Sequence, residues 1–351
     1  MPLAEVVEID PQTRLVFGQG LDLAHGQPDV ANAIVHLTGE TLVLVDTGVT
    51  IAFRDALAAA AESLGTWSEV LLLTTHGHAD HVGNNDLIES LAADLPLGRA
   101  RHYVSAFDAG QLLDNGQTYW TRSLARVQGL VRGVDDPAAS AQALMSIFQP
   151  MVPRTRFTRT FEELPLEHLR VGPLHLSGWS FCDGAIQAIR TRGHCAGQIV
   201  VHLADSKLIH LSDESNGPCG AMHDANQLNI VRAVGDALTL VETGHVDVVT
   251  EGHRFELLRR DAAIARLSDI LNQAAELDAA AGRLIGADSC DTATFIDEFT
   301  AEAERIGVTG ANPNPMFNAM TALEKLHDQG LVPSGDGPEQ KWRRPRLNTE
   351  P

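Results

Sequence analysis

The 351-residue sequence is short of cysteine, of basic residues and of long apolar runs, and each shortage excludes a class of protein. Cysteine occurs only at Cys182, Cys195, Cys219 and Cys290, without the close pairs of a zinc–thiolate site. Scattered thiols of this kind are typical of reduced cysteines in the cytoplasm. No apolar run reaches the roughly 20 residues that span a bilayer, and no signal peptide is visible in residues 1–11. We therefore expect a cytoplasmic protein without a membrane partner.

The charge balance argues against a second class of partner. Lys and Arg number 26 against 46 Asp and Glu, which gives a formal net charge of −20. A surface with this excess of negative charge repels phosphate backbones, so we expect no nucleic-acid partner. Hydrophobic residues make up 44% of the chain and charged residues 21%, which is typical of a folded globular protein. We expect a small-molecule substrate, and assembly with like or unlike chains stays open.

The N-terminal part of the chain alternates strands and helices. Two apolar runs, 33–37 and 41–45, flank a turn that contains Gly39 and predict a hairpin. An Ala- and Leu-rich helix is expected over 51–63, and a strand that is apolar on both faces over 70–74. A further helix is expected over 86–93. This alternation indicates an α/β fold.

The rest of the chain divides by its hydrophobic pattern. A helical pattern over about 108–163 predicts an insertion. Short β-like runs return beyond Leu164, at 174–179, 185–189, 199–203, 208–211 and 246–249. From residue 261 helical patterns dominate. We expect one domain over 1–260, a helical extension over 261–332 that packs on it or forms an oligomer interface, and a flexible tail over 333–351.

The most informative segment is Thr75-His76-Gly77-His78-Ala79-Asp80-His81, directly after the strand expected at 70–74. Imidazole nitrogens and carboxylate oxygens are ligands for a zinc-type cation. In an extended loop His76 and His78 project to the same side and reach one ion. A turn through Ala79 aims Asp80 and His81 at a second ion. The sequence therefore predicts a metal site at the end of this strand.

Such a site needs ligands from elsewhere in the chain, and three residues of the right type follow predicted strands. His194 lies in Gly193-His194-Cys195, Asp213 ends the run Ile209-His210-Leu211-Ser212-Asp213, and His253 lies in Gly252-His253. A rigid sheet positions side chains at the ends of its strands. We therefore expect these three residues to complete the metal site.

Taken together, these motifs resemble the metallo-β-lactamase-fold superfamily, in its binuclear hydrolase branch with the His-x-His-x-Asp-His motif. The resemblance covers about residues 30–255 and rests on five separated motifs in the family's order, of which the first is Val45-Asp46-Thr47-Gly48. It implies an αββα sandwich, here with a helical insertion and a helical C-terminal extension. The site then lies at the edges of the sheets, and residues 1–260 form the catalytic domain.

The resemblance also implies a role for each motif residue. His76, His78 and His194 match the ligands of the first metal, and Asp80, His81 and His253 match those of the second. Asp213 matches the carboxylate that bridges the two metals, and Asp46 the acid that supports the metal loop from behind.

A mechanism follows from two cations about 3.5–4 Å apart, which hold a bridging hydroxide and lower the pKa of water towards ~7. The implied cofactor is two zinc ions per chain, with iron or manganese as alternatives. We expect Asp80 to relay a proton to the leaving group and Asp46 to orient the ligand loop. The expected function is hydrolysis of a small organic ester, lactone, thioester or activated aryl ether.

Two other functions stay open at this point. A mononuclear iron dioxygenase of the same fold, similar to the persulfide dioxygenases, shares much of the first ligand set. His253 completes a two-metal set and favours hydrolysis. A non-catalytic member of the family usually lacks ligands, and this chain has them.

Several nearby residues have a second interpretation. Cys195 is next to His194, but neighbours in an extended segment point in opposite directions, which favours a packed thiol. His223 is expected to be an ordinary solvated or core histidine. Tyr119 and Trp120 form either a lid over the substrate or the core of the insertion.

Overall fold

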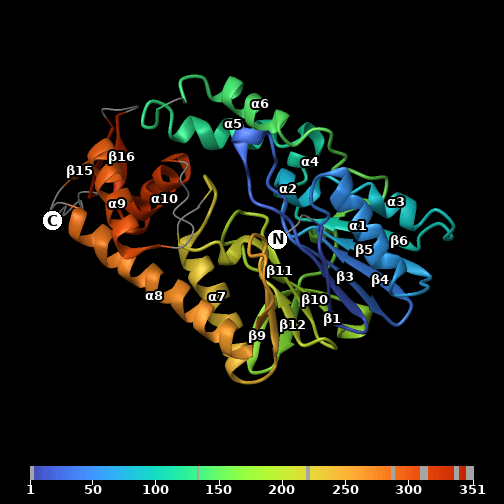
Figure 1. Ribbon diagram of the computed structural model, residues 1–351. Coiled ribbons are helices and arrows are strands. Elements are labelled where there is room, and N and C mark those ends of the chain that lie inside the picture. Colours follow the sequence, from blue (N-terminus) through green and yellow to red (C-terminus); the bar gives the residue numbers. More distant parts are fainter. Residues whose placement is uncertain are drawn as a thin grey trace.

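The computed structural model describes residues 4–132, 134–218, 222–285, 289–308, 315–335 and 340–344. Two seven-stranded sheets face each other, and helices cover their outer faces (Figure 1). The first sheet has its strands in chain order: β1 (Val6–Asp10), β2 (Thr13–Val16), β3 (Ala33–Thr38), β4 (Thr41–Val45), β5 (Glu69–Leu73), β6 (Ala100–Val104) and β7 (Thr158–Thr160). The β1–β4 strands are antiparallel, and β4 to β7 are parallel.

The second sheet is antiparallel except for the pairing of β12 with β13, which is parallel. From one edge to the other it contains β14 (Leu258–Arg259), β13 (Val248–Thr250), β12 (Leu208–His210), β11 (Ile199–Leu203), β10 (Ile186–Arg190), β9 (Leu174–Phe181) and β8 (Glu167–Val171). The loops that follow β12 and β13 therefore leave the sheet at the same edge, which brings distant parts of the chain together.

Alternate residues of the central strands enter two different cores, which explains their unbroken apolar runs. In β5, Leu71 and Leu73 pack in the core between the sheets, where Trp179 and Val201 of the second sheet meet them. Val70 and Leu72 of the same strand face outward and pack in the core that includes α1 (Ile51–Glu62), whose Phe53 is fully buried. On the far side, α7 (Gln227–Glu242) and α8 (Arg260–Leu284) cover the second sheet. The predicted αββα sandwich is confirmed.

Most predicted elements are confirmed at nearly their expected bounds. The hairpin is β3–β4, and its two strands pair in register from Ile34 with Val45 to Thr38 with Thr41. The helix expected over 51–63 is α1, which begins where the Thr50 hydroxyl accepts a hydrogen bond from the Phe53 amide. The helix expected over 86–93 is α3 (Leu87–Leu91). Helix α7 and the strands β1, β2, β6 and β8 are elements that the sequence pattern did not predict.

The expected helical insertion contains α4 (Gln111–Asp114), α5 (Gln117–Arg126) and α6 (Pro137–Ser146). The Asp136 carboxylate caps α6 by accepting from the amides of Ala138 and Ala139, with Pro137 in the first turn. The last part of the range 108–163 contains no α-helix. It forms the edge strand β7 and the 3-10 turn Phe161–Glu163.

The C-terminal part consists of α8, α9 (Thr292–Ile306), α10 (Pro315–Asp328) and a small sheet of β15 (Ser289–Asp291), β17 (Lys341–Arg343) and β16 (Val332–Ser334). The first half of α8 packs on the sandwich through Leu267 and Ile270, and its second half packs with α9 and α10. Strands β16 and β17 fall in the range expected to be a flexible tail, and Trp342 is buried there. In the described part of the chain, no helix is long and apolar enough to cross a membrane.

Candidate metal centre

The ligand string leaves β5 and is held in place by Asp46, at the end of β4. The Asp46 carboxylate accepts a 2.7 Å hydrogen bond from the Thr75 amide and a 2.6 Å bond from the Thr75 hydroxyl. It also lies 2.8 Å from Nδ1 of His81, which leaves Nε2 of that ring to face the site. Asp46 is fully buried. A carboxylate that fixes both the loop and the tautomer of a ligand histidine is a recurrent feature of metal sites.

The short helix α2 (Ala79–Val82) explains how six consecutive residues serve two groups of donors. His76 and His78 precede the helix, with extended backbone at His78, whereas Asp80 and His81 lie on its single turn. Thr75 also joins the sheets, because its carbonyl accepts from Ile199 of β11 and its hydroxyl lies 2.8 Å from that of Ser212. The string is therefore fixed to both sheets before its first histidine.

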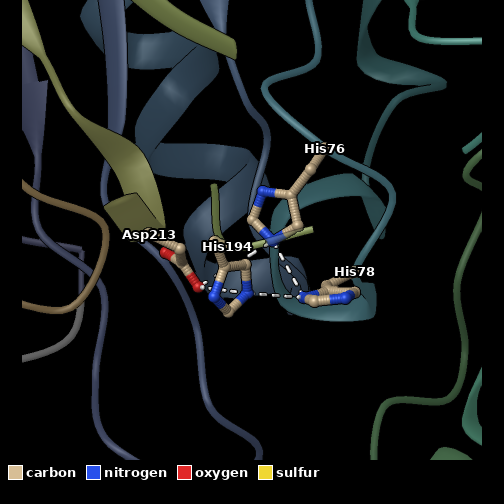
Figure 2. Close-up of side chains that lie close together, drawn as sticks. All are labelled: His76, His78, His194 and Asp213. Carbon is tan, nitrogen blue, oxygen red and sulfur yellow. Dashed lines mark hydrogen bonds and ion pairs between the residues drawn. The ribbon is translucent and has the colours of Figure 1, made fainter. Parts of the chain in front are cut away.

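The first group of donors is formed by His76, His78, His194 and Asp213 (Figure 2). Nδ1 of His78 lies 2.9 Å from Nε2 of His76 and 3.3 Å from Nε2 of His194. Oδ2 of Asp213 lies 3.5 Å from the His194 nitrogen and 3.8 Å from the His76 nitrogen. A tetrahedral zinc ion with bonds of about 2.0–2.1 Å places its ligand atoms about 3.3–3.4 Å apart. The observed spacings bracket this value.

The second group is formed by Asp80, His81, Asp213 and His253. Nε2 of His81 lies 3.4 Å from Oδ2 of Asp80 and 3.2 Å from Oδ1 of Asp213. Nε2 of His253 lies 3.1 Å from Oδ2 of Asp80 and 3.4 Å from Oδ2 of Asp213. Asp213 belongs to both groups, so one carboxylate lies between two sets of converging donors.

The donor atoms fit divalent cations in a further respect. Nε2 of His81 and Oδ1 of Asp213 are buried 3.2 Å apart, but neither forms a hydrogen bond with the other or with another group in the described part of the chain. Buried polar atoms are normally paired, and an ion is one common reason when they are not. Imidazole and carboxylate donors suit zinc, iron and manganese alike. The seven ligand candidates from the sequence thus lie in two groups that share Asp213.

The two groups differ in electrostatics. Burial, together with the neighbouring His194, lowers the pKa of His78 to about 3. Burial and nearby histidines also lower the pKa of His76. Burial alone would lower the pKa of His81, but Asp213, Asp80 and Asp46 outweigh it and raise that pKa well above its usual value. The first group therefore offers neutral imidazoles, which is the form that binds a cation.

Three non-glycine residues with left-handed backbone lie in the loops around the site. The φ angles are +59° at Asp46, +58° at Arg192 and +51° at Ser212. Such conformations cost of the order of 1–3 kcal/mol each and concentrate at functional sites. Asp46 is the carboxylate that holds the ligand loop, Arg192 lies two residues before His194, and Ser212 is next to Asp213. The strained backbone is therefore located at the donor loops.

Two buried acids that the sequence did not predict support the donor loops. Glu214 is buried and accepts 2.8 and 2.9 Å hydrogen bonds from the amides of Gly193 and His194. Any side chain at Gly193 would overlap this carboxylate, because a Cβ there would lie 2.1 Å from Oε2. Asp108 is buried beside Gly77 and Gly197, and burial raises its pKa to about 8. Glu214 directly follows Asp213 in the sequence, which is the one local signal that pointed to it.

Helix α5 of the insertion covers the first group. The ring of His78 lies 5.0 Å from that of Tyr119 and 5.7 Å from that of Trp120. The Tyr119 hydroxyl donates a 2.8 Å hydrogen bond to Asp224, which also accepts from the Ala196 amide in the His194 loop. Both aromatic residues also belong to the core that joins the insertion to the helical extension. They are thus core residues and neighbours of the donors at once.

The remaining candidates are placed as follows. His223 is partly exposed, and its Nδ1 lies 2.7 Å from the Ser123 hydroxyl of α5. Cys195 is fully buried and belongs to neither group of donors, as the packed-thiol interpretation expects. Cys219 lies outside the described residues.

Comparison with known proteins gives one family. Residues 26–179 match the family model of the metallo-beta-lactamase superfamily. A comparison with curated proteins found no match.

Several solved structures share the fold at low sequence identity. A metallo-beta-lactamase family protein from Thermus thermophilus is 18% identical with a TM-score of 0.56, over 90% of this chain and 94% of that one. A beta-lactamase domain protein from Burkholderia ambifaria is 18% identical with a TM-score of 0.53, over 98% and 95%. The sec-alkylsulfatase Pisa1 from a Pseudomonas species is 16% identical with a TM-score of 0.55, over 93% of this chain but only 50% of the sulfatase. These similarities establish the fold.

Proposed function

We propose that this chain, a member of the metallo-beta-lactamase superfamily, is a hydrolase that uses two zinc ions to cleave a small organic substrate. One observation carries the proposal: two sets of converging donors share the carboxylate of Asp213. A single shared carboxylate offsets the repulsion between two cations and fixes their separation. A mononuclear site uses only the first set, so a complete second set favours two cations.

When bound, a pair of divalent cations supplies an activated water molecule and polarises the oxygen of the substrate. The chain's own residues provide the rest. Neutral imidazoles of His76, His78 and His194 hold the first position, and Asp46 keeps the ring of His81 turned towards the second. No side chain has to act as a nucleophile.

Asp80 is the proposed proton carrier. It belongs to the second group, and its side chain is 14% exposed while that of His81 is fully buried. Its Oδ2 lies 3.1 Å from Nε2 of His253. A carboxylate at the boundary between the donors and solvent is placed to pass a proton to a leaving group, a role that the geometry supports without a further residue.

For the substrate we propose an ester, lactone, thioester or activated aryl ether. The sulfatase among the similar folds adds a sulfate ester to the compounds worth testing. Aromatic side chains of α5 next to His78 supply an apolar wall for an acyl or aryl group. We further propose that the protein acts in the cytoplasm on a small molecule, without a nucleic acid or membrane; the free thiols of Cys182, Cys195 and Cys290 support a reducing compartment.

Metal analysis together with a substrate panel tests this function. Two zinc ions per chain, together with zinc-dependent cleavage of at least one chromogenic ester, lactone, thioester, sulfate ester or nitroaryl ether, are expected. His202→Gln is a suitable control, since His202 is a buried histidine that hydrogen-bonds Gln187 and belongs to neither donor group. One iron per chain with oxygen uptake would instead identify the iron dioxygenase, and the hydrolase proposal would then be wrong.

A further inference from the structure

The second group of donors depends on two loops that are far apart in sequence. Asp213 lies in the 3-10 turn Ser212–Ser215 after β12, and His253 lies between β13 and β14. The loops touch directly, because the Leu211 amide donates to the carbonyl of Thr250 and the Gly252 amide donates to the carbonyl of Ser212, each at 2.8 Å. The position of His253 relative to Asp213 is thus a matter of how these two loops are held.

Arg266 of α8 is hydrogen-bonded to both loops from outside the sandwich. Its Nη2 donates a 2.9 Å hydrogen bond to the carbonyl of Ser215, two residues after Asp213. Its Nε donates a 3.2 Å hydrogen bond to Oε1 of Glu251, two residues before His253. The side chains of Arg266 and Glu251 are only 9% and 3% exposed. The contact therefore lies away from solvent, where screening by salt is weak.

The chemistry of this contact favours a positioning role. A guanidinium group presents several donors in a rigid plane, so one side chain fixes the angle as well as the distance between two acceptors. A lysine carries the same charge but lacks that geometry. A second tether, Asn32, donates from Nδ2 to the carbonyls of Glu251 and Arg254, and so holds the His253 loop from the first sheet. Arg266 alone joins the Asp213 loop to the His253 loop through α8 among the contacts described here.

We propose that Arg266 is a positioning residue that holds Asp213 and His253 at the separation needed for the second cation. This inference rests on the proposed two-metal function. It gives the C-terminal helical extension a part in the metal centre, because α8 supplies the side chain that joins the loops. Outer contacts of this kind typically change metal affinity by about 10–100-fold when they are removed.

The test measures zinc binding and folding separately. The proteins are the full-length chain, Arg266→Lys, Glu251→Gln and the control Arg283→Gln, each stripped of metal and then titrated with zinc against a chromogenic chelator. Arg283 is a suitable control because it lies on the same helix and forms an ion pair with Glu302 at the surface, where its side chain is 61% exposed. Thermal unfolding of the metal-free proteins shows whether each variant is folded.

We expect the Arg266→Lys and Glu251→Gln variants to bind the second zinc ion about tenfold or more weakly, with the first zinc affinity within about twofold of the unmodified chain. Arg283→Gln should bind both ions normally. If the unmodified chain binds two ions and both test variants match it, the positioning role is wrong and the hydrolase proposal stands. If both affinities fall in parallel with thermal stability, Arg266 serves the fold alone and the inference is also wrong. An unmodified chain that binds fewer than two ions would overturn the inference together with the proposed function.

Discussion

The two groups of donors in the metal centre share Asp213 but differ in how they are enclosed. In the first group, the side chains of His76 and His194 are 0% and 4% exposed, and helix α5 lies against His78. In the second group, the side chains of Asp80 and His253 are 14% and 21% exposed. The second group is therefore more accessible to solvent through Asp80 and His253, although its His81 is as buried as the first group.

The groups also differ in what holds their ligand loops. Glu214 binds two backbone amides around His194, so the first group is braced within the sandwich. His253 is held by Asn32 and by the contact of Glu251 with Arg266, which belongs to the helical extension. We therefore expect the first group to bind its cation more tightly than the second group binds its own.

Asp213→Ala should have the largest effect because this carboxylate serves both groups. The change removes one negative charge from each, while His76, His78 and His194 still form three sides of the first site. We expect about one cation per chain and a loss of activity of at least about a hundredfold. The residual activity should need a higher pH, since one cation acidifies water less than two. Metal analysis and a pH–rate profile check both points; retention of two ions and the original profile would refute the bridging role.

His253→Ala and His76→Ala together separate the two groups. His253 belongs only to the second group. Its removal should therefore leave the first cation bound and lower activity by about tenfold to a hundredfold. His76 belongs only to the first group, and its removal should weaken binding of the first cation directly. Zinc titration of both variants is the measurement. Equal loss of metal from the two variants would contradict the expected difference in affinity between the first and the second group.

Much of this centre was accessible from the sequence because its signals are local. The string from His76 to His81 lies within six residues after an apolar run, and the hairpin of β3 and β4 is marked by the turn at Gly39. His194, Asp213 and His253 each follow a strand, so strand prediction together with residue type was enough to select them. The alternation of strands and helices indicated the α/β class, whereas the αββα sandwich came from the resemblance to the metallo-β-lactamase-fold superfamily.

The supporting residues were not accessible in this way, because their partners are distant in sequence. Glu214 binds amides some twenty residues earlier, and Arg266 meets Glu251 only after α8 has turned back along the second sheet. Charged residues of this kind look like ordinary surface charges in a sequence. By contrast, α7 had a readable helical pattern in Ile230, Val234, Ala237 and Val241, and this local signal was missed.

Trp120→Ala tests the proposed apolar wall that the aromatic side chains of α5 form beside His78. Trp120 packs between His78 and Phe317 and belongs to no donor group, so its loss should open space beside the first site without removing a ligand. We expect KM for the best substrate to change by about threefold to tenfold, with the zinc content unchanged. Steady-state kinetics and metal analysis are run on the same preparation. Loss of stability and metal with unchanged selectivity would show that Trp120 is a core residue only.

Tyr119→Phe should give the smallest effect and refines the same point. It removes the hydroxyl that donates to Asp224 but keeps the ring that lies 5.0 Å from the ring of His78. Asp224 is 26% exposed, so water can replace the lost donor and the net cost is about 1 kcal/mol. If the wall acts through its aromatic surface, KM should change less than twofold and less than in Trp120→Ala. A larger change in Tyr119→Phe than in Trp120→Ala would mean that the hydroxyl and its contact with Asp224, rather than the apolar surface, control substrate binding beside His78.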